Sequence, residues 1–192
     1  ITGYTATAMT TNTGLFANIA TGALIHNLKL TAASVSASGT DLAIAALAAV
    51  NNGTIENCFA DGSINSDGST NSVAAIAGRN QGTISACFSS ALVTAAGDLD
   101  MAGLIAGYNT GNINNCYGDT GIQASGSVCI AGTIAGINEG AISNCYSIAT
   151  AANVGGESVA GAVVGANFIS GVITGCYYDA ALGAGVGAGS SA

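Results

Sequence analysis

The chain has 192 residues, of which 29 are glycine and none is proline or tryptophan. It has 2 lysine and arginine residues against 10 aspartate and glutamate residues, so its formal net charge at pH 7 is −8. This balance excludes binding to nucleic acid or to an anionic membrane through a basic surface, because too few cations are available to neutralise the phosphates. With 49% hydrophobic residues the chain is too apolar to be a disordered segment, and its length suits one folded unit.

No segment is predicted to span a membrane. The longest unbroken apolar run, 42–50, is far shorter than the roughly 20 residues that a spanning helix needs. We therefore expect no membrane insertion.

A repeat of 29 residues runs along most of the chain. In each unit a glycine, an isoleucine and a cysteine recur in the same phase, and an aromatic residue follows the cysteine. The cysteine column contains Cys58, Cys87, Cys116, Cys145 and, after a two-residue insertion near 168–170, Cys176. So many positions in phase indicate a repeat architecture.

The repeat divides the chain into units. We expect an atypical first unit at 14–50, regular units at 51–79, 80–108, 109–137 and 138–166, and a last unit at 167–182. Residues 1–182 then form a single repeat domain. The segment 183–192 is rich in glycine, alanine and serine and is predicted to be a linker or a frayed end.

Each unit is predicted to contain two strands and two turns. The first strand is short and alternates apolar and polar residues, as in 83–88, and a variable loop follows, as in 60–71. The second strand is an apolar stretch of small residues, as in 101–107, and 109–111 turns the chain into the next unit.

A unit of this size has too few large apolar side chains to bury a face alone, so neighbouring units must stack. Parallel pairing of equivalent strands about 4.8 Å apart gives an all-β fold, a β-solenoid similar to a parallel β-helix, with about six turns. The core would consist of ladders of equivalent residues, namely Ile55, Ile84, Ile113, Ile142 and Ile173, then Ile76, Ile105 and Ile134 with Val163, and the cysteine column. The alternative is a meander of β-hairpins. Glycine and asparagine at every corner favour the solenoid, because tight coil turns need φ > 0.

The cysteine column admits two interpretations. Neighbours in the column lie about one strand spacing apart, which is within the Cα range of a disulfide. However, Leu28 occupies the same column in the first unit, which indicates that the position holds a buried apolar side chain. We therefore favour free cysteines in a structural ladder. Cys129 falls outside the column, where other units have Asn71, Asp100 and Ser158, and is either an exposed thiol or a residue without a special role.

Metal, cofactor and catalytic sites are not expected. There is no Cys-x-x-Cys pair, and the only histidine is His26. A lyase site would need cations placed together, but the two cations, Lys29 and Arg79, lie in different units at different repeat positions.

The acidic residues form two candidate pairs. Asp61 and Asp119 share a repeat position two units apart, so they would lie about 10 Å from each other by the strand spacing. This pair and the neighbours Asp98 and Asp100 are interpreted as solvated loop acids rather than a glycosidase pair. Weak calcium binding at these loops stays open, although the spacing of calcium β-rolls is absent.

The best candidate for an interaction face is a row of aromatic residues after the cysteines. Its members are Phe59, Phe88, Tyr117, Tyr146 and Tyr177, with Tyr178 beside the last. An exposed row of this kind would bind a protein or glycan ligand. The alternative is that the variable loops cover the row and make it a second small core.

The pattern Gly-x-Ile-x-Asn-Cys-Tyr at 111–117 and 140–146 resembles the GLUG-motif repeats of bacterial surface proteins. Residues 102–109 are similar to the second element of that family, and 14–17 and 25–28 to the segment that begins its arrays. Ala86 and Gly175 depart from the pattern, because asparagine usually stands there. The resemblance covers roughly 14–178 and implies a secreted or cell-surface, adhesin-like protein with a β-solenoid fold and no catalytic residues.

Three hypotheses for the function follow. The first is a non-enzymatic adhesin-like module that binds a host, glycan or protein partner through its loops and aromatic face. The second is a structural subunit of an extracellular fibre that self-associates end to end. The third, ice binding, needs a regular outward threonine column. The candidate column, which reads Thr54, Thr83, Asn112, Ala141 and Val172, does not supply it.

Overall fold

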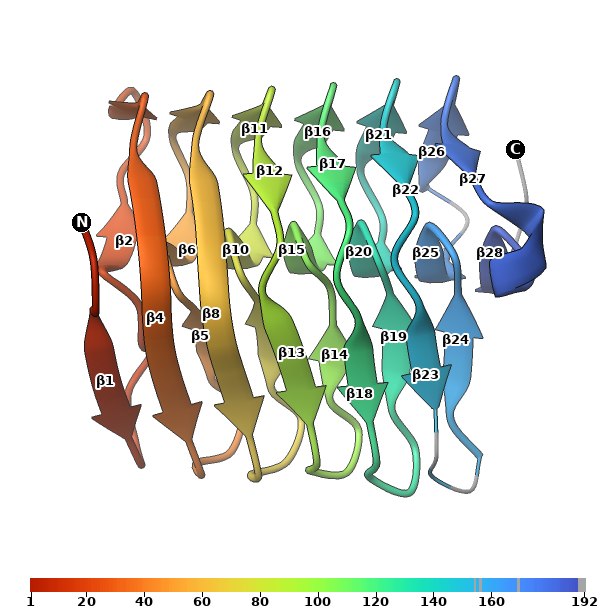
Figure 1. Ribbon diagram of the computed structural model, residues 1–192, viewed down its shortest axis with the longest axis horizontal. Coiled ribbons are helices and arrows are strands. Elements are labelled where there is room, and N and C mark those ends of the chain that lie inside the picture. The colour runs from red at the N-terminus through yellow and green to blue at the C-terminus, as the bar shows by residue number, and fades with distance from the viewer. Residues whose placement is uncertain (154, 156, 169, 190–192) are drawn as a thin grey trace.

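Consecutive 29-residue units form consecutive turns of a coil, as the computed structural model in Figure 1 shows. The structure describes residues 1–153, 155, 157–168 and 170–189. All strand pairs within these residues are parallel, so the predicted β-solenoid of about six turns is confirmed and the meander of hairpins is wrong.

Each turn of the coil contributes to four sheets, which follow one another in the order first, second, third and fourth. The first sheet contains β1 (Thr5–Ala8), β4 (Lys29–Ala37), β8 (Phe59–Ser66), β12 (Phe88–Ser89), β13 (Leu92–Ala95), β17 (Tyr117–Gly118), β18 (Ile122–Ala124), β22 (Tyr146–Ser147), β23 (Ala151–Asn153) and β27 (Tyr177–Tyr178). The second sheet contains β5 (Ala43–Ala45), β9 (Ser72–Ala74), β14 (Met101–Ala102), β19 (Ile130–Gly132) and β24 (Val159–Gly161).

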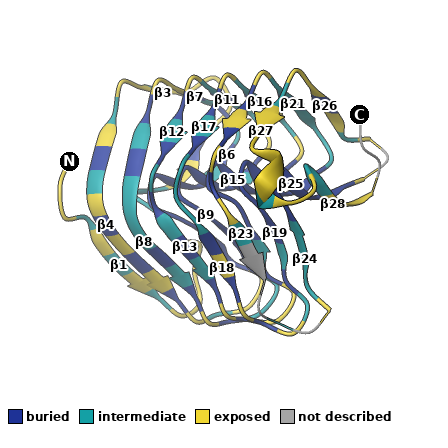
Figure 2. Ribbon diagram, turned by 45° about the vertical axis from the view of Figure 1, so that its right-hand side comes forward, coloured by how far each residue is buried: buried dark blue, intermediate teal, exposed yellow. Residues whose placement is uncertain are grey.

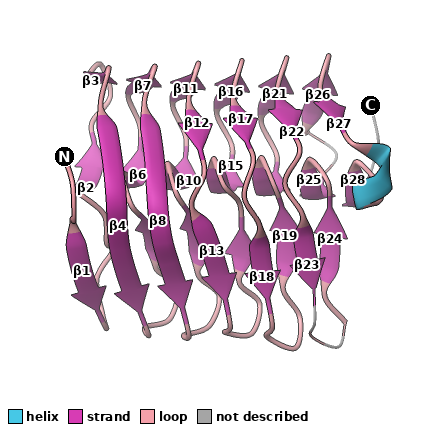
Figure 3. Ribbon diagram, in the orientation of Figure 1, coloured by secondary structure: helices cyan, strands magenta, loops and turns pink. Residues whose placement is uncertain are grey.

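The third and fourth sheets complete the turn. The third contains β2 (Phe16–Ile19), β6 (Ala48–Asn51), β10 (Ala77–Asn80), β15 (Ala106–Asn109), β20 (Ala135–Asn138), β25 (Val164–Asn167) and β28 (Val186–Gly189). The fourth contains β3 (Leu24–His26), β7 (Thr54–Glu56), β11 (Thr83–Ser85), β16 (Asn112–Asn114), β21 (Ala141–Ser143) and β26 (Val172–Thr174). One short 3-10 helix, η1 (Ala180–Leu182), lies within the described part of the chain (Figure 3). No helix in that part is both long and apolar enough to cross a bilayer.

The apolar core runs along the coil axis as ladders. In the fourth sheet Ile84 pairs in register with Ile55 on one side and Ile113 on the other, and all three are fully buried. The second predicted ladder, from Ile76 to Val163, is also buried. Figure 2 shows buried segments on successive coils. Burying one isoleucine side chain contributes about 1.5–3 kcal/mol, and each coil adds such residues at the same places.

A polar column is buried beside this core. The sequence marks the asparagines that end the third-sheet strands only as turn residues. In the structure, Nδ2 of Asn80 donates to Oδ1 of Asn109 at 2.7 Å, and the same bond repeats from coil to coil. The column consists of Asn51, Asn80, Asn109, Asn138 and Asn167. Because a buried amide must be hydrogen-bonded, this ladder favours a register in which asparagine faces asparagine.

The corner before the cysteine column has a left-handed backbone. Its residues, with φ between 50° and 59°, are Asn27, Asn57, Ala86, Asn115, Asn144 and Gly175. Asparagine and glycine tolerate this conformation, which explains why the repeat prefers them there. Ala86 adopts the same φ of 50° without that advantage.

Both ends of the coil contain more strand than the sequence suggests. The segment 183–192 was expected to be a linker or a frayed end, yet β28 lies within it and pairs with β25, with Val186 opposite Val164. At the other end β1 pairs with β4 ahead of the expected first unit. The physical reason is that a solenoid strand offers backbone donors and acceptors along its whole edge, so even a glycine-rich segment can pair. Residues 190–192 of the expected tail and 169 of the insertion lie outside the described residues.

Candidate binding surfaces

The aromatic row lies on the outer face of the first sheet. Phe59, Phe88, Tyr117 and Tyr146 begin β8, β12, β17 and β22 and pair in register. Their ring centroids are 5.0, 4.7 and 5.3 Å apart in that order, with interplanar angles of 28°, 17° and 7°. The residue after each aromatic is small and buried, so the strand directs the ring outward. Stacking in this geometry stabilises the row in addition to the area that it buries.

Exposure increases along the row. Phe59, Phe88 and Tyr117 are half-buried, whereas Tyr146 is 45% and Tyr177 70% exposed. Tyr177 continues the backbone register of Tyr146, and Tyr178 beside it is 39% exposed. The variable loops thus leave this end of the row open to solvent.

Lys29 lies at the other end of the row. It pairs in register with Phe59, and its Nζ is 5.4 Å from the ring centroid, within cation–π range. The sequence raises Lys29 only as one of two cations that a lyase site would need. Its place in the repeat alignment, opposite the first aromatic residue, was the signal that could have found this contact.

The acidic candidates accept hydrogen bonds from backbone N–H groups and hydroxyls in the turns. Oδ1 of Asp61 accepts a hydrogen bond from the backbone N–H of Ala32 at 2.5 Å. Asp98 accepts from the backbone N–H and the hydroxyl of Ser127 at 2.8 and 2.6 Å, and these bonds lower the pKa of its carboxyl. Asp119 accepts from the hydroxyl of Thr120 at 3.0 Å. Among the residues that the structure describes, no group of three or more His, Cys, Asp or Glu side chains is placed to bind a metal ion.

The five cysteines of the column are free thiols in contact with the core. Each thiol donates to a carbonyl two residues earlier, as Cys87 does to Ser85 at 3.2 Å. The neighbouring thiols Cys145 and Cys87, followed by burial, raise the pKa of Cys116. These contacts are those of a structural ladder, in which thiols fill space and satisfy carbonyls.

A second inward column lies at the corner between the first and second sheets. It contains Asn71, Asp100, Cys129 and Ser158, and the expectation that Cys129 is exposed is wrong, because this residue is fully buried. Its thiol donates to the carbonyl of Gly97 at 3.1 Å. The sequence could not show this burial, because the repeat is compatible with a corner side chain that points into the core and with one that points to solvent.

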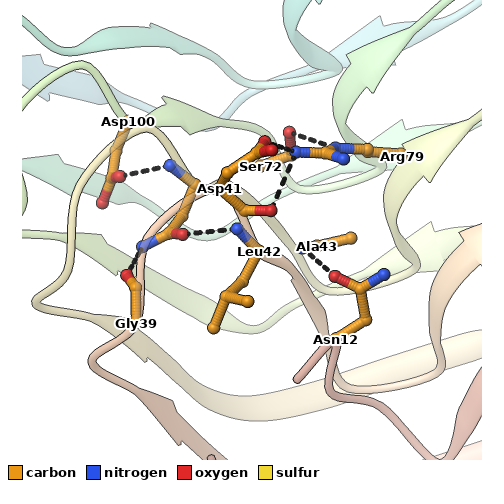
Figure 4. Close-up of polar contacts among 9 residues, drawn as sticks. Asn12, Gly39, Asp41, Leu42, Ala43, Ser72, Arg79 and Asp100 are labelled. Atoms are coloured by element: carbon orange, nitrogen blue, oxygen red, sulfur yellow. Dashed lines mark hydrogen bonds and ion pairs between the residues drawn. The ribbon is translucent and has the colours of Figure 1, made fainter. Parts of the chain in front are cut away.

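Asp100 is the exceptional member of this corner column (Figure 4). Its side chain is fully buried, so the interpretation of Asp100 as a solvated loop acid is wrong. Its Oδ2 has no hydrogen-bond partner within the described structure. Burial is the main cause that raises the pKa of this carboxyl to about 6. Because the Asp100 carboxyl is buried and cannot reach a ligand, its titration should change the free energy of unfolding and not a binding site.

The solenoid also carries a groove where the second and third sheets meet. Arg79 donates from Nε to the hydroxyl of Ser72 at 3.3 Å and from its terminal nitrogen to the carboxylate of Asp41 (Figure 4). Tyr108 occupies the same position one coil later. Burial and then the hydrogen bond with Glu139 raise the pKa of the Tyr108 phenol. Sequence reasoning missed the groove, although the chain's only arginine standing in an otherwise uncharged column was a signal.

Comparison with known proteins supports the fold. No protein-family model and no curated protein sequence matches the chain. A solved structure of a putative immunoglobulin A1 protease from Bacteroides ovatus matches with a TM-score of 0.77 and 22% identity. The match covers 97% of this chain and 59% of that one, so this chain spans little more than half of the length of the protein it resembles. At this identity the similarity shows a shared β-solenoid fold.

Proposed function

We propose that the chain is a non-enzymatic, extracellular binding module, adhesin-like, that engages a protein or glycan partner through the aromatic row. The observation that carries this proposal is the stacked row itself, which is open to solvent at Tyr146 and Tyr177. Exposed aromatic residues in a contiguous patch are typical of interaction surfaces. The rigid coil spaces the rings regularly, so little conformational entropy is lost when a partner binds.

A binding role is favoured over catalysis by the state of the charged residues. Asp61 and Asp98 accept hydrogen bonds from turns, and Lys29 lies over Phe59. A general acid or base must be within reach of a substrate proton, and these side chains are engaged in structural contacts. The resemblance to GLUG-motif repeats supports a secreted or cell-surface bacterial location. The solved structure of similar fold belongs to a bacterial protein that is named as a putative protease, and we assign a binding rather than a cleaving role to this chain.

The test is a binding screen with matched variants. The purified chain is applied to a glycan array and to a panel of immobilised extracellular proteins, and the double variant Tyr146→Ser with Tyr177→Ser is compared with it. We expect at least a tenfold loss of affinity for the partner found. Val172→Ser, on an exposed strand position of the fourth sheet, is the control and should bind normally. Equal binding by the double variant would refute the proposal.

A fibre subunit is the second candidate. A cavity of about 260 Å³ at the C-terminal end is lined by apolar residues, among them Val163, Ile173 and Val186. β28 pairs with β25 on one side, and its other edge has no partner within the described chain. Unpaired parallel edges can accept a further coil, which would extend the solenoid. Light scattering over a range of concentrations and negative-stain images would reveal rods, whereas a monomer at every concentration would refute this candidate.

A further inference from the structure

The groove between the second and third sheets is shaped by glycine. A Cβ on Gly107 would lie 2.5 Å from the backbone nitrogen of Val73, and one on Gly78 would lie 2.6 Å from that of Ile44. Only glycine therefore allows the backbones of the two sheets to approach so closely. The groove that results has a volume of about 420 Å³, which is in the range of small-molecule sites.

The walls of the groove come from columns of outward residues. Arg79, Tyr108 and Ile137 occupy one position on successive coils of the third sheet, and Ser72 and Met101 face them from the second. Phe168 lies on the next coil and also lines the groove. Three coil spacings of about 4.8 Å make the groove about 15 Å long, and it runs parallel to the axis.

Donors and acceptors in the groove are held in fixed pairs. The guanidinium of Arg79 is bound by the carboxylate and carbonyl of Asp41 and by the hydroxyl of Ser72, so its orientation is set before any ligand arrives. Glu139 lies close enough to the phenol of Tyr108 to raise its pKa, after the larger effect of burial. Side chains that are already ordered lose little further conformational entropy when a ligand binds.

From this geometry we propose that the groove binds a neutral linear oligosaccharide along the coil axis. Sugar hydroxyls both donate and accept hydrogen bonds, which matches the alternating donors and acceptors of Arg79, Tyr108 and Glu139. The apolar faces of sugar rings match Met101, Tyr108 and Phe168, which supply apolar surface in the same groove. A mostly apolar lining with a few placed polar groups is the usual composition of a ligand site.

Charge and backbone pairing argue against other ligands. Two carboxylates, Asp41 and Glu139, and one guanidinium leave the groove with a small negative charge, which disfavours sulfated or acidic sugars. An extended peptide would need a free strand edge, but β10 and β15 are paired on both sides. The groove lies on different sheets from the aromatic row, so this inference does not rest on the proposed function.

Calorimetric titration of the full chain tests the proposal. The probes are cellotetraose, maltotetraose, mannotetraose and chitotetraose, with tetragalacturonate as the anionic comparison. We expect at least one neutral tetrasaccharide to bind with a dissociation constant of millimolar or tighter, and tetragalacturonate to bind at least tenfold more weakly. No binding of any neutral probe, or preference for the anionic one, would overturn the proposal.

Variants locate the site. Tyr108→Ala should weaken binding at least tenfold, and the milder Tyr108→Phe, which keeps the ring and loses the hydroxyl, should weaken it by a smaller factor. Val172→Ser should leave this binding unchanged, because Val172 lies on the fourth sheet and does not line the groove. Loss of binding in the Tyr146 and Tyr177 variant with normal binding by both Tyr108 variants would overturn the groove proposal and leave the aromatic row as the glycan site.

Discussion

The backbone N–H of Asn71 donates to Oδ1 of Asp100 in the next coil at 2.7 Å, while Oδ2 of the same buried carboxyl has no partner within the described structure. The other members of the corner column each donate to the carbonyl 32 residues earlier, as Asn71 does to Gly39 at 2.9 Å. Asp100 makes no such bond from its side chain, and its burial disfavours the ionised carboxylate more than the bond from Asn71 favours it, so the fold raises the pKa of Asp100.

This relationship predicts a pH dependence of stability. The pKa of Asp100 is about 6 in the folded state and close to the ordinary value when unfolded, so the folded state binds more protons between about pH 4 and pH 6. The contribution is fully present below that window and is lost as the pH rises through the folded pKa. Asp100→Asn should therefore stabilise the protein at pH 7 by about 2–3 kcal/mol and remove this slope. Chemical unfolding between pH 4 and pH 8 measures both effects.

The control for this prediction is Asp67→Asn, which removes the same charge from an exposed position. It should change the free energy of unfolding by less than about 0.5 kcal/mol at any pH. An Asp100→Asn variant that is less stable than the parent at pH 7 would contradict a raised pKa of Asp100 in the folded state.

The asparagine ladder predicts a large local cost when it is interrupted. Asn109→Ala removes the acceptor of Asn80 and the donor to Asn138, which leaves polar groups buried on both neighbouring coils. We expect a loss of about 2–4 kcal/mol in the free energy of unfolding. Asn112→Ala, which removes the same side chain from an exposed strand position, should cost less than about 0.5 kcal/mol. Similar losses of unfolding free energy in the Asn109 and Asn112 variants would show that the hydrogen bonds of the ladder add nothing to the intrinsic preference for asparagine.

The left-handed corner predicts a stabilising substitution. Ala86 is exposed and has φ of 50°, where equivalent positions have asparagine or glycine. Ala86→Asn should raise the free energy of unfolding by about 0.5–1 kcal/mol, because asparagine adopts this conformation more readily than alanine. Ala141→Asn, at an extended strand position, should give no gain. Thermal melts of the two variants compare them directly, and a lower melting temperature for Ala86→Asn would be evidence against backbone strain there.

Burial predicts unequal thiol reactivity. Cys176 is partly exposed, whereas Cys58, Cys87, Cys116, Cys129 and Cys145 are at most 2% exposed. Under native conditions an aromatic disulfide reagent should modify one thiol rapidly and the others only as the protein unfolds. Cys176→Ser should abolish the rapid phase. Fast modification of several thiols would mean that the column opens in solution.

The ladders and the parallel register could be predicted from the sequence, because a repeat of constant length forces equivalent residues onto adjacent coils. Ile84 between Ile55 and Ile113 is the direct consequence. The aromatic row followed for the same reason, since its rings are also 29 residues apart.

Contacts between different columns could not be predicted in this way. Arg79 and Asp41 are 38 residues apart, which is not a multiple of the repeat, so no column of equivalent residues brings them together. The burial of Asn109, Asp100 and Cys129 likewise depends on which way each corner turns.

The sequence by itself thus determined the architecture of this protein, its axial order and the spacing of the aromatic row, since these depend on the period alone. The tertiary structure decided the cross-section of the coil: the groove beside Arg79, the inward corner columns and the pairing of β28. Those features arise from backbone angles at a few glycine and asparagine corners and from side-chain packing across the coil. The periodicity of a sequence does not encode either of them.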